Sequence, residues 1–106
     1  MALYAVTYAY VPETEPMTRA RSAHVDFLAS LHEQGRLLAS GRLTECDPLG
    51  ALLVITGDSV ADVEALMDGD PFQVGGFIAE RLVRQWNLAF GVVGAAGTEG
   101  HPAQAA

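Results

Sequence analysis

Two kinds of hydrophobic pattern alternate along the chain. Leu3–Tyr10 is short and rich in aromatic and β-branched residues, which predicts a strand. Val11–Met17 contains two prolines and two glutamates and is interpreted as an exposed loop. From Thr18 to Gln34 the pattern is helical, with Thr18 as the cap and Gly35 just beyond the end. Its apolar residues recur at intervals of three and four and predict one buried stripe: Ala20, Ala23, Phe27, Leu28 and Leu31.

The middle of the chain has the pattern of a β-hairpin. Arg36–Leu43 predicts a second strand, and Thr44–Gly50 predicts a turn that begins at Asp47-Pro48. Ala51–Thr56 is a continuous apolar run, too short for a typical helix. We therefore expect a third strand that is buried on both faces and pairs antiparallel with the second.

Turn residues divide the second half of the chain. Ser59 begins a helix that ends at Gly69, and Asp70-Pro71-Phe72 begins a short extra turn. Phe77–Leu88 alternates as a strand and is expected to place Ile78, Leu82 and Trp86 on one face. The stretch 91–106 is rich in Gly and Ala without periodicity, which predicts a disordered tail after a single domain spanning residues 1–90.

The predicted order of elements is β-α-β-β-α-β, the ferredoxin-like arrangement of the α+β class, with a four-stranded antiparallel sheet. Two helices can cover only one face of such a sheet. The other face needs a partner, and a homodimer in which two sheets press together would bury it.

Composition narrows the classes of function. The 106 residues include 13 acidic and 6 basic side chains, all six of them arginine, for a net charge of -7. This balance argues against binding to nucleic acid or to an anionic membrane surface. There is one cysteine, and no apolar run approaches the ~20 residues of a membrane helix, so we expect a cytoplasmic protein. The sequence has no metal-ligand spacing and no motif for haem, flavin or nicotinamide, so neither metal nor cofactor is expected.

Histidine is the side chain best suited to move protons near neutral pH. His101 lies in the predicted tail, and His32 lies near the end of the first helix, where a surface or capping role explains it. His24 lies at the edge of the predicted apolar stripe. Such a histidine is more often a hydrogen-bonded core residue than a catalyst. Asp70, before Pro71, has an equally ordinary interpretation as a helix cap.

Four sequence motifs favour a functional role for His24 and Asp70. The motifs are Arg21–Leu28 (RSAHVDFL), Gln34–Gly41 (QGRLLASG), Asp70–Phe72 (DPF) and Val83–Asn87 (VRQWN). Together they resemble the YciI-like (YCII-related) family, and the similarity extends from about Leu3 to Leu88. The resemblance implies a dimeric α+β barrel and a site with a His–Asp pair, which corresponds here to His24 and Asp70. A few relatives are dehydrochlorinases that act on chlorinated hydroxyquinols, and most have no assigned reaction.

With that pair, the expected function is a small enzyme that needs no cofactor and carries out an elimination or isomerisation on a small, aromatic or quinol-like molecule. Asp70 would orient His24, the general acid/base. The expected binding residues are apolar walls and polar contacts: Phe27, Phe72 and Tyr8 as walls, and Ser40 and Gly41 for a polar substituent. Arg21 or Arg42 could attract an anionic group, although a solvated surface arginine is the ordinary interpretation of each. Two alternatives stay open, a module that binds or senses a metabolite and a dimeric accessory domain without catalysis.

Overall fold

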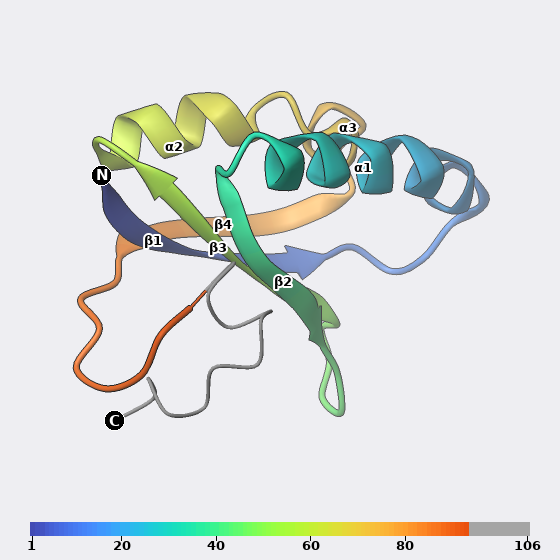
Figure 1. The fold of residues 1–106 in the computed structure, drawn as a ribbon. Coiled ribbons are helices and arrows are strands. Elements are labelled where there is room, and N and C mark those ends of the chain that lie inside the picture. Colours follow the sequence, from blue (N-terminus) through green and yellow to red (C-terminus); the bar gives the residue numbers. More distant parts are fainter. Residues whose placement is uncertain (94–106) are drawn as a thin grey trace.

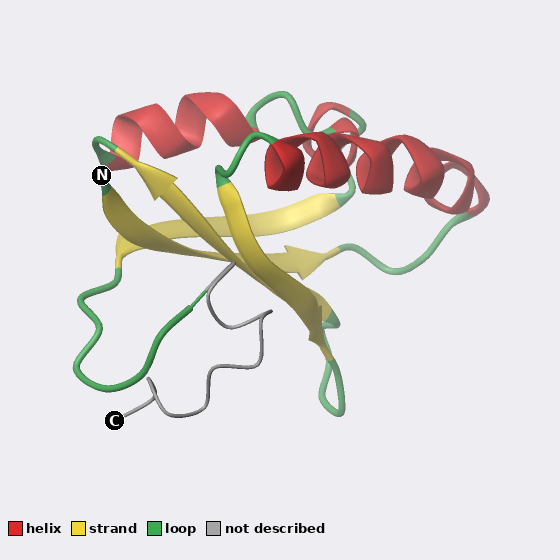
Figure 2. Cartoon of the chain, in the orientation of Figure 1, coloured by secondary structure: helices red, strands yellow, loops and turns green. Residues whose placement is uncertain are grey.

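The structure is a computed structural model that describes residues 1–93. Three helices lie on one face of a four-stranded antiparallel sheet whose strand order is β2-β3-β1-β4 (Figures 1 and 2). The predicted α+β order is confirmed, with the short turn at Pro71 forming a helix of its own. The elements are β1 (Ala2–Tyr10), α1 (Glu15–Glu33), β2 (Leu37–Leu43), β3 (Gly50–Gly57), α2 (Val60–Met67), α3 (Pro71–Val74) and β4 (Ile78–Gln85).

The core lies between the sheet and the helices. Every second residue of β1 is buried there, and the register pairs Tyr4 with Ile55 and Val6 with Leu53 on the central strand β3. Six of the eight β3 residues are buried, as expected for its continuous apolar run. Full burial of side chains of this size stabilises the fold by about 1.5–3 kcal/mol each. The same alternation directs Tyr8 toward the helices.

Helix α1 begins earlier than its sequence predicts. Thr14, not Thr18, is the N-cap, and its hydroxyl accepts a hydrogen bond from the Met17 N–H. Pro16 fits inside the first turn because the N–H that proline lacks has no intrahelical partner there. The prediction of Ala23 in the buried stripe was also wrong, because that residue is exposed. The buried residues of the helix are Met17, His24 and Leu31, so His24 lies in the middle of the stripe and not at its edge.

Strand β4 is shorter than predicted and changes face at a bulge. It ends at Gln85, and the register against β1 shifts between Ala9 and Tyr10. Ile78 therefore pairs with Tyr10 and packs against the core, whereas Leu82 lies on the opposite face and is exposed. The prediction of Ile78 and Leu82 on one face was wrong because strict alternation does not survive a bulge.

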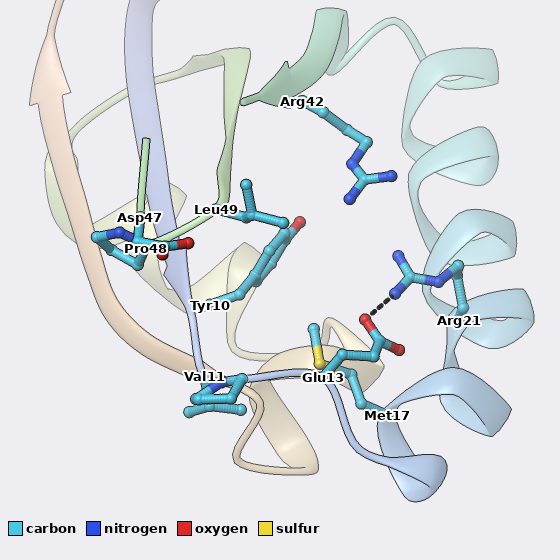
Figure 3. Close-up of a pocket in the computed structure, with 10 residues that line it drawn as sticks. Tyr10, Val11, Glu13, Met17, Arg21, Arg42, Asp47, Pro48 and Leu49 are labelled. Carbon is cyan, nitrogen blue, oxygen red and sulfur yellow. Dashed lines mark hydrogen bonds and ion pairs between the residues drawn. The ribbon is translucent and has the colours of Figure 1, made fainter. Parts of the chain in front are cut away.

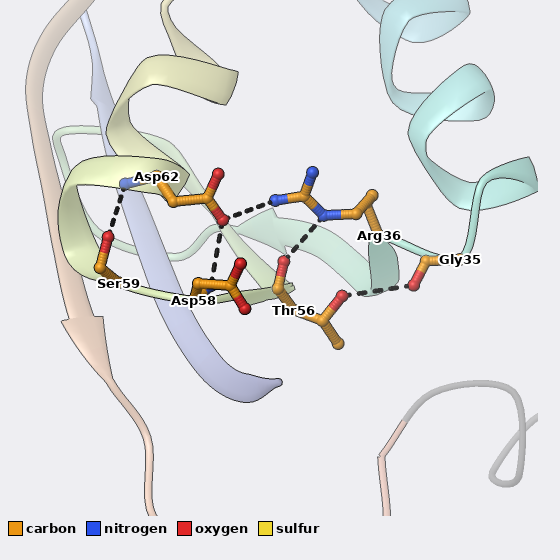
Figure 4. A network of polar contacts seen from close by, with 6 residues as sticks. All are labelled: Gly35, Arg36, Thr56, Asp58, Ser59 and Asp62. Carbon is orange, nitrogen blue, oxygen red and sulfur yellow. Dashed lines mark hydrogen bonds and ion pairs between the residues drawn. The ribbon is translucent and has the colours of Figure 1, made fainter.

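A polar network joins the start of α2 to the end of α1 (Figure 4). The Ser59 hydroxyl accepts a hydrogen bond from the Asp62 N–H, as the predicted cap requires. Asp62 in turn accepts from the Asp58 N–H at 3.0 Å and from the Arg36 guanidinium at 3.1 Å. Arg36 also donates to the Thr56 carbonyl oxygen. Gly35, at φ +79°, ends α1 in the left-handed conformation that glycine adopts without strain.

The end of the chain falls mainly outside the described residues. The predicted tail begins at residue 91, and its residues from 94 onward, His101 included, are not described. The described helices contain no segment with the length and apolar character needed to cross a membrane. The predicted homodimer stays a prediction.

Candidate active site

Asp70 is the centre of a buried hydrogen-bond network. It caps α3, and its Oδ1 accepts a hydrogen bond from the Phe72 N–H at 2.9 Å. That much is ordinary for Asp before Pro at a helix start. The unusual feature is that Asp70 is 0% exposed. A carboxylate withdrawn from water needs hydrogen bonds on both oxygens, and the next two contacts supply them.

His24 supplies the first of these contacts. Its Nδ1 lies 2.8 Å from Asp70 Oδ1, across 46 residues of sequence, because α1 and α3 pack side by side. A carboxylate only accepts hydrogen bonds, so Nδ1 carries the proton and Nε2 of the neutral ring presents its lone pair. No described residue hydrogen-bonds Nε2, and no buried side-chain nitrogen or oxygen in the described part of the chain lacks a partner. The small exposed part of the ring, 9% of the side chain, therefore includes Nε2.

Tyr8 supplies the second contact. Its hydroxyl donates to Asp70 Oδ2 at 2.8 Å. Burial raises the pKa of the Tyr8 phenol, and the charge of Asp70 and their hydrogen bond raise it further, so Tyr8 remains a donor. The backbone beside it is tightly enclosed, because a Cβ at Gly50 would lie 2.0 Å from the Tyr8 carbonyl oxygen. Only glycine allows β3 to pass β1 at this distance.

Phe72 fixes the orientation of the imidazole. The two rings are stacked, with centroids 4.0 Å apart and planes 3° from parallel. Tyr10 and Phe77 contact the Phe72 ring edge-on, at centroid distances of 5.7 Å and 5.9 Å. Phe72 is completely buried, so it supports His24 from behind and offers no free surface to a ligand.

A hollow of about 550 Å³ opens next to this network (Figure 3). Its size is within the range of small-molecule sites. Neither His24 nor Asp70 lines it. Two of its lining residues connect it to the pair, because Tyr10 and Arg21 both contact the Phe72 ring on which His24 stacks. The lining residues are Tyr10, Val11, Pro12, Glu13, Met17, Arg21, Arg42, Asp47, Pro48 and Leu49.

The other predicted binding residues lie elsewhere. Phe27 is partly buried beneath the loop after α2, where a Cβ at Gly69 would lie 3.3 Å from its ring. Ser40 and Gly41 are exposed on the edge strand β2 and do not line the hollow. Their predicted contacts with a ligand stay predictions, and the structure does not bring them to His24.

The hollow contains residues that the sequence did not single out. Tyr10 was expected only as the last residue of an aromatic-rich strand, and Met17 was assigned to a loop. The sequence pointed to this hollow only through two arginines. Arg21 and Arg42 were both named as candidates for an anionic group, and both line the hollow. Glu13, just before α1, also lines the hollow and binds Arg21 at 2.6 Å. Hydrogen bonds from Thr18 and Arg21 lower the pKa of Glu13.

The described residues contain no group of three or more His, Cys, Asp or Glu side chains placed to hold a metal ion. The arrangement is instead that of an oriented acid/base: an imidazole with one nitrogen on a buried carboxylate and the other at the surface.

Comparison with known proteins assigns the chain to a family. The sequence model of the YCII-related domain matches residues 2–87, and the protein belongs to this family. No protein with a curated description matches the sequence.

Two solved structures resemble the fold. One is TftG, the 5-chloro-2-hydroxyhydroquinone dehydrochlorinase of Burkholderia phenoliruptrix AC1100 in complex with 2,5-dihydroxybenzoquinone. It is 21% identical, with a TM-score of 0.68, and the match covers 82% of this chain and 95% of TftG. The other is At3g17210 of Arabidopsis thaliana, 10% identical with a TM-score of 0.48 over 84% of this chain and 96% of that one. At these identities the likeness to TftG concerns the fold.

Proposed function

We propose that this protein is a small enzyme in which His24 acts as general acid/base on a small molecule and Asp70 orients it. The observation that carries the proposal is the buried pair itself. Asp70 holds Nδ1 at 2.8 Å, Phe72 holds the plane of the ring, and Nε2 is the nitrogen left for a substrate proton. An imidazole held in this way contributes about 10²–10⁴-fold to a proton-transfer rate.

The reaction class is an elimination or an isomerisation. In an elimination, Nε2 takes a proton from the substrate, the electrons of that bond form a new π bond, and the leaving group departs with its own electron pair. In an isomerisation, the same nitrogen returns the proton to another atom. The dehydrochlorinase activity in the name of TftG, a protein with this fold, supports the first.

The substrate is small because the available space is small. We place its body in the hollow beside Tyr10, with the reacting carbon directed toward His24. Tyr10 and Arg21 line the hollow and contact the Phe72 ring on which His24 stacks, so the hollow adjoins the aromatic cluster that holds the imidazole.

We further propose that the protein acts as a homodimer. Leu43, Leu82 and Trp86 expose apolar side chains, and Leu43 and Leu82 are on the sheet face away from the helices. A second copy of this face would cover them. Sedimentation equilibrium tests this directly, and a monomer at micromolar concentration would contradict it.

Replacement of His24 tests the catalytic proposal. We expect the protein to release chloride from 5-chloro-2-hydroxyhydroquinone and the His24→Gln variant to lose at least about 100-fold of the rate. His32→Gln is the matched control, because His32 is an exposed residue of the same helix, and it should keep full activity. Full activity in a folded His24→Gln variant would refute the catalytic role of His24. If the unmodified protein releases no chloride from this quinol, the proposed elimination reaction is refuted.

A second function has one observation in its favour. His24 does not line the hollow, which is what a module that binds a metabolite without transforming it would show. Calorimetry with the same quinol, combined with mass spectrometry of the product, distinguishes the two. Binding with no product favours the module, and turnover favours the enzyme.

A further inference from the structure

We propose that the hollow beside Tyr10 binds the negatively charged head group of a small organic acid, with Arg42 as its principal contact. This inference rests on the proposed function, since it gives the hollow in which we place the substrate a preference for a negatively charged group. Three observations carry it: an arginine without a carboxylate partner, the convergence of two guanidinium groups, and an apolar remainder of the lining.

The first observation, an arginine without a carboxylate partner, is unexpected in so acidic a chain, which has 13 carboxylate side chains and 6 arginines. Four arginines form ion pairs with Asp or Glu: Arg19, Arg21, Arg36 and Arg81. Among the described residues, Arg42 and Arg84 have no carboxylate within ion-pair distance. Of these two, only Arg42 lines the hollow. An arginine guanidinium offers planar, paired donors that match a carboxylate.

The second observation is that the positive charges converge. The guanidinium groups of Arg21 and Arg42 face each other on the side of the hollow where the phenol oxygen of Tyr10 lies, and Arg21 is bound to Glu13 (Figure 3). Burial raises the pKa of Tyr10, the charge of Asp70 raises it too, and Arg21 and Arg42 lower it. The phenol thus lies within the field of both guanidinium groups. An anion placed beside the Tyr10 hydroxyl would meet Arg42 and this hydrogen-bond donor, with Arg21, which is bound to Glu13, nearby.

The third observation concerns the remainder of the lining. Val11, Met17, Pro48 and Leu49 give the hollow an apolar wall suited to a flat hydrocarbon body. Two acidic residues, Glu13 and Asp47, also line the hollow. Hydrogen bonds from Thr18 and Arg21 lower the pKa of Glu13, and the charges of Arg21 and Arg42 both lower it as well. Glu13 is bound to Arg21, and Asp47 forms no ion pair with either arginine and lies on the other side of Tyr10 (Figure 3). Arg42 is therefore the lining arginine without an ion-pair partner, and it lies in a hollow that also has an apolar wall.

Benzoate and benzamide provide a matched pair of probes, equal in shape and different in charge. We expect amide NMR titrations of the full chain to show benzoate bound at least about tenfold more tightly than benzamide, with shifts at Tyr10, Met17 and Arg42. Arg42→Gln should weaken benzoate binding about tenfold, and Arg84→Gln, which removes the other arginine without a carboxylate partner, should leave it unchanged. Equal binding of the two probes, or equal effects of the two variants, would overturn the inference.

Glu13→Gln gives a test of the opposite sign. Removal of this carboxylate frees Arg21 for the ligand, so benzoate should bind about two- to fivefold more tightly. Weaker binding would contradict the arrangement. The failure of this inference is distinguishable from that of the proposed function through His24→Gln, which should lose turnover and retain benzoate affinity. If that variant retains turnover while Arg42→Gln loses benzoate, the anion site stands without the catalytic role.

Discussion

Two aspartates at the starts of short helices show how much burial changes a carboxylate that accepts a backbone hydrogen bond. Asp62, in the first turn of α2, accepts hydrogen bonds from the Asp58 N–H and from Arg36, and its side chain is 39% exposed. Asp70, at the cap of α3, accepts from the Phe72 N–H, His24 and Tyr8, and is fully enclosed. Each carboxylate also joins elements that are distant in sequence.

The difference between them is the solvent. Water can replace any partner that Asp62 loses, so its ion pair with Arg36 contributes little. No water reaches Asp70, and each of its three donors would lose a partner if the carboxylate were removed. A cap motif therefore becomes a candidate site when the fold encloses it and brings a histidine to it.

The largest expected effect is on the free energy of unfolding when each of the two carboxylates is removed in a separate variant. Asp70→Ala should lower the free energy of unfolding by about 3–5 kcal/mol, because it leaves three buried donors without an acceptor. Asp62→Ala should lower it by about 1 kcal/mol, the usual effect of a lost helix-start contact. Urea denaturation of both variants measures the difference. Equal losses would show that burial of Asp70 has no energetic consequence.

A smaller effect is expected from the tyrosine that contacts Asp70. Tyr8→Phe should lower the free energy of unfolding by about 1–3 kcal/mol, since Asp70 Oδ2 loses the one side-chain donor it has among the described residues while the aromatic ring remains. Tyr4→Phe is the control on the same strand, because Tyr4 is equally buried and its hydroxyl hydrogen-bonds no described residue. It should change stability by less than about 0.5 kcal/mol. A large loss in the control would show that the ring packing, not the hydrogen bond, was disturbed.

The smallest effect belongs to an exposed carboxylate, Glu13. Hydrogen bonds from Thr18 and Arg21 lower its pKa in the folded protein, so it adds stability above its unfolded pKa of about 4.3. That contribution is lost as the pH falls through the lower folded pKa. An NMR titration of the Glu13 carboxyl carbon should have its midpoint below 4.3, and Thr18→Ala should raise it. A midpoint that does not respond to Thr18→Ala would contradict the assigned cause.

Particular residues show how far the sequence could predict the site. The helical spacing placed His24 near the core, and the family resemblance paired it with Asp70, which the fold then brought within 2.8 Å. Tyr8 was expected as a wall because nothing local to β1 indicates that its hydroxyl would find Asp70, 62 residues away. The bulge at Ala9 and Tyr10 likewise depends on how β4 pairs with β1, and alternation within one strand does not reveal it.

By itself, the sequence determined the order and type of the elements, because those follow from periodicity and caps within a few neighbouring residues. The tertiary structure alone decided which polar groups share an enclosed space. It set the burial of Asp70, the stacking of His24 on Phe72, and the meeting of Arg21 and Arg42 at one hollow. Solvent exclusion depends on several segments packing at once, and it is solvent exclusion that gives these hydrogen bonds and charges their chemical importance.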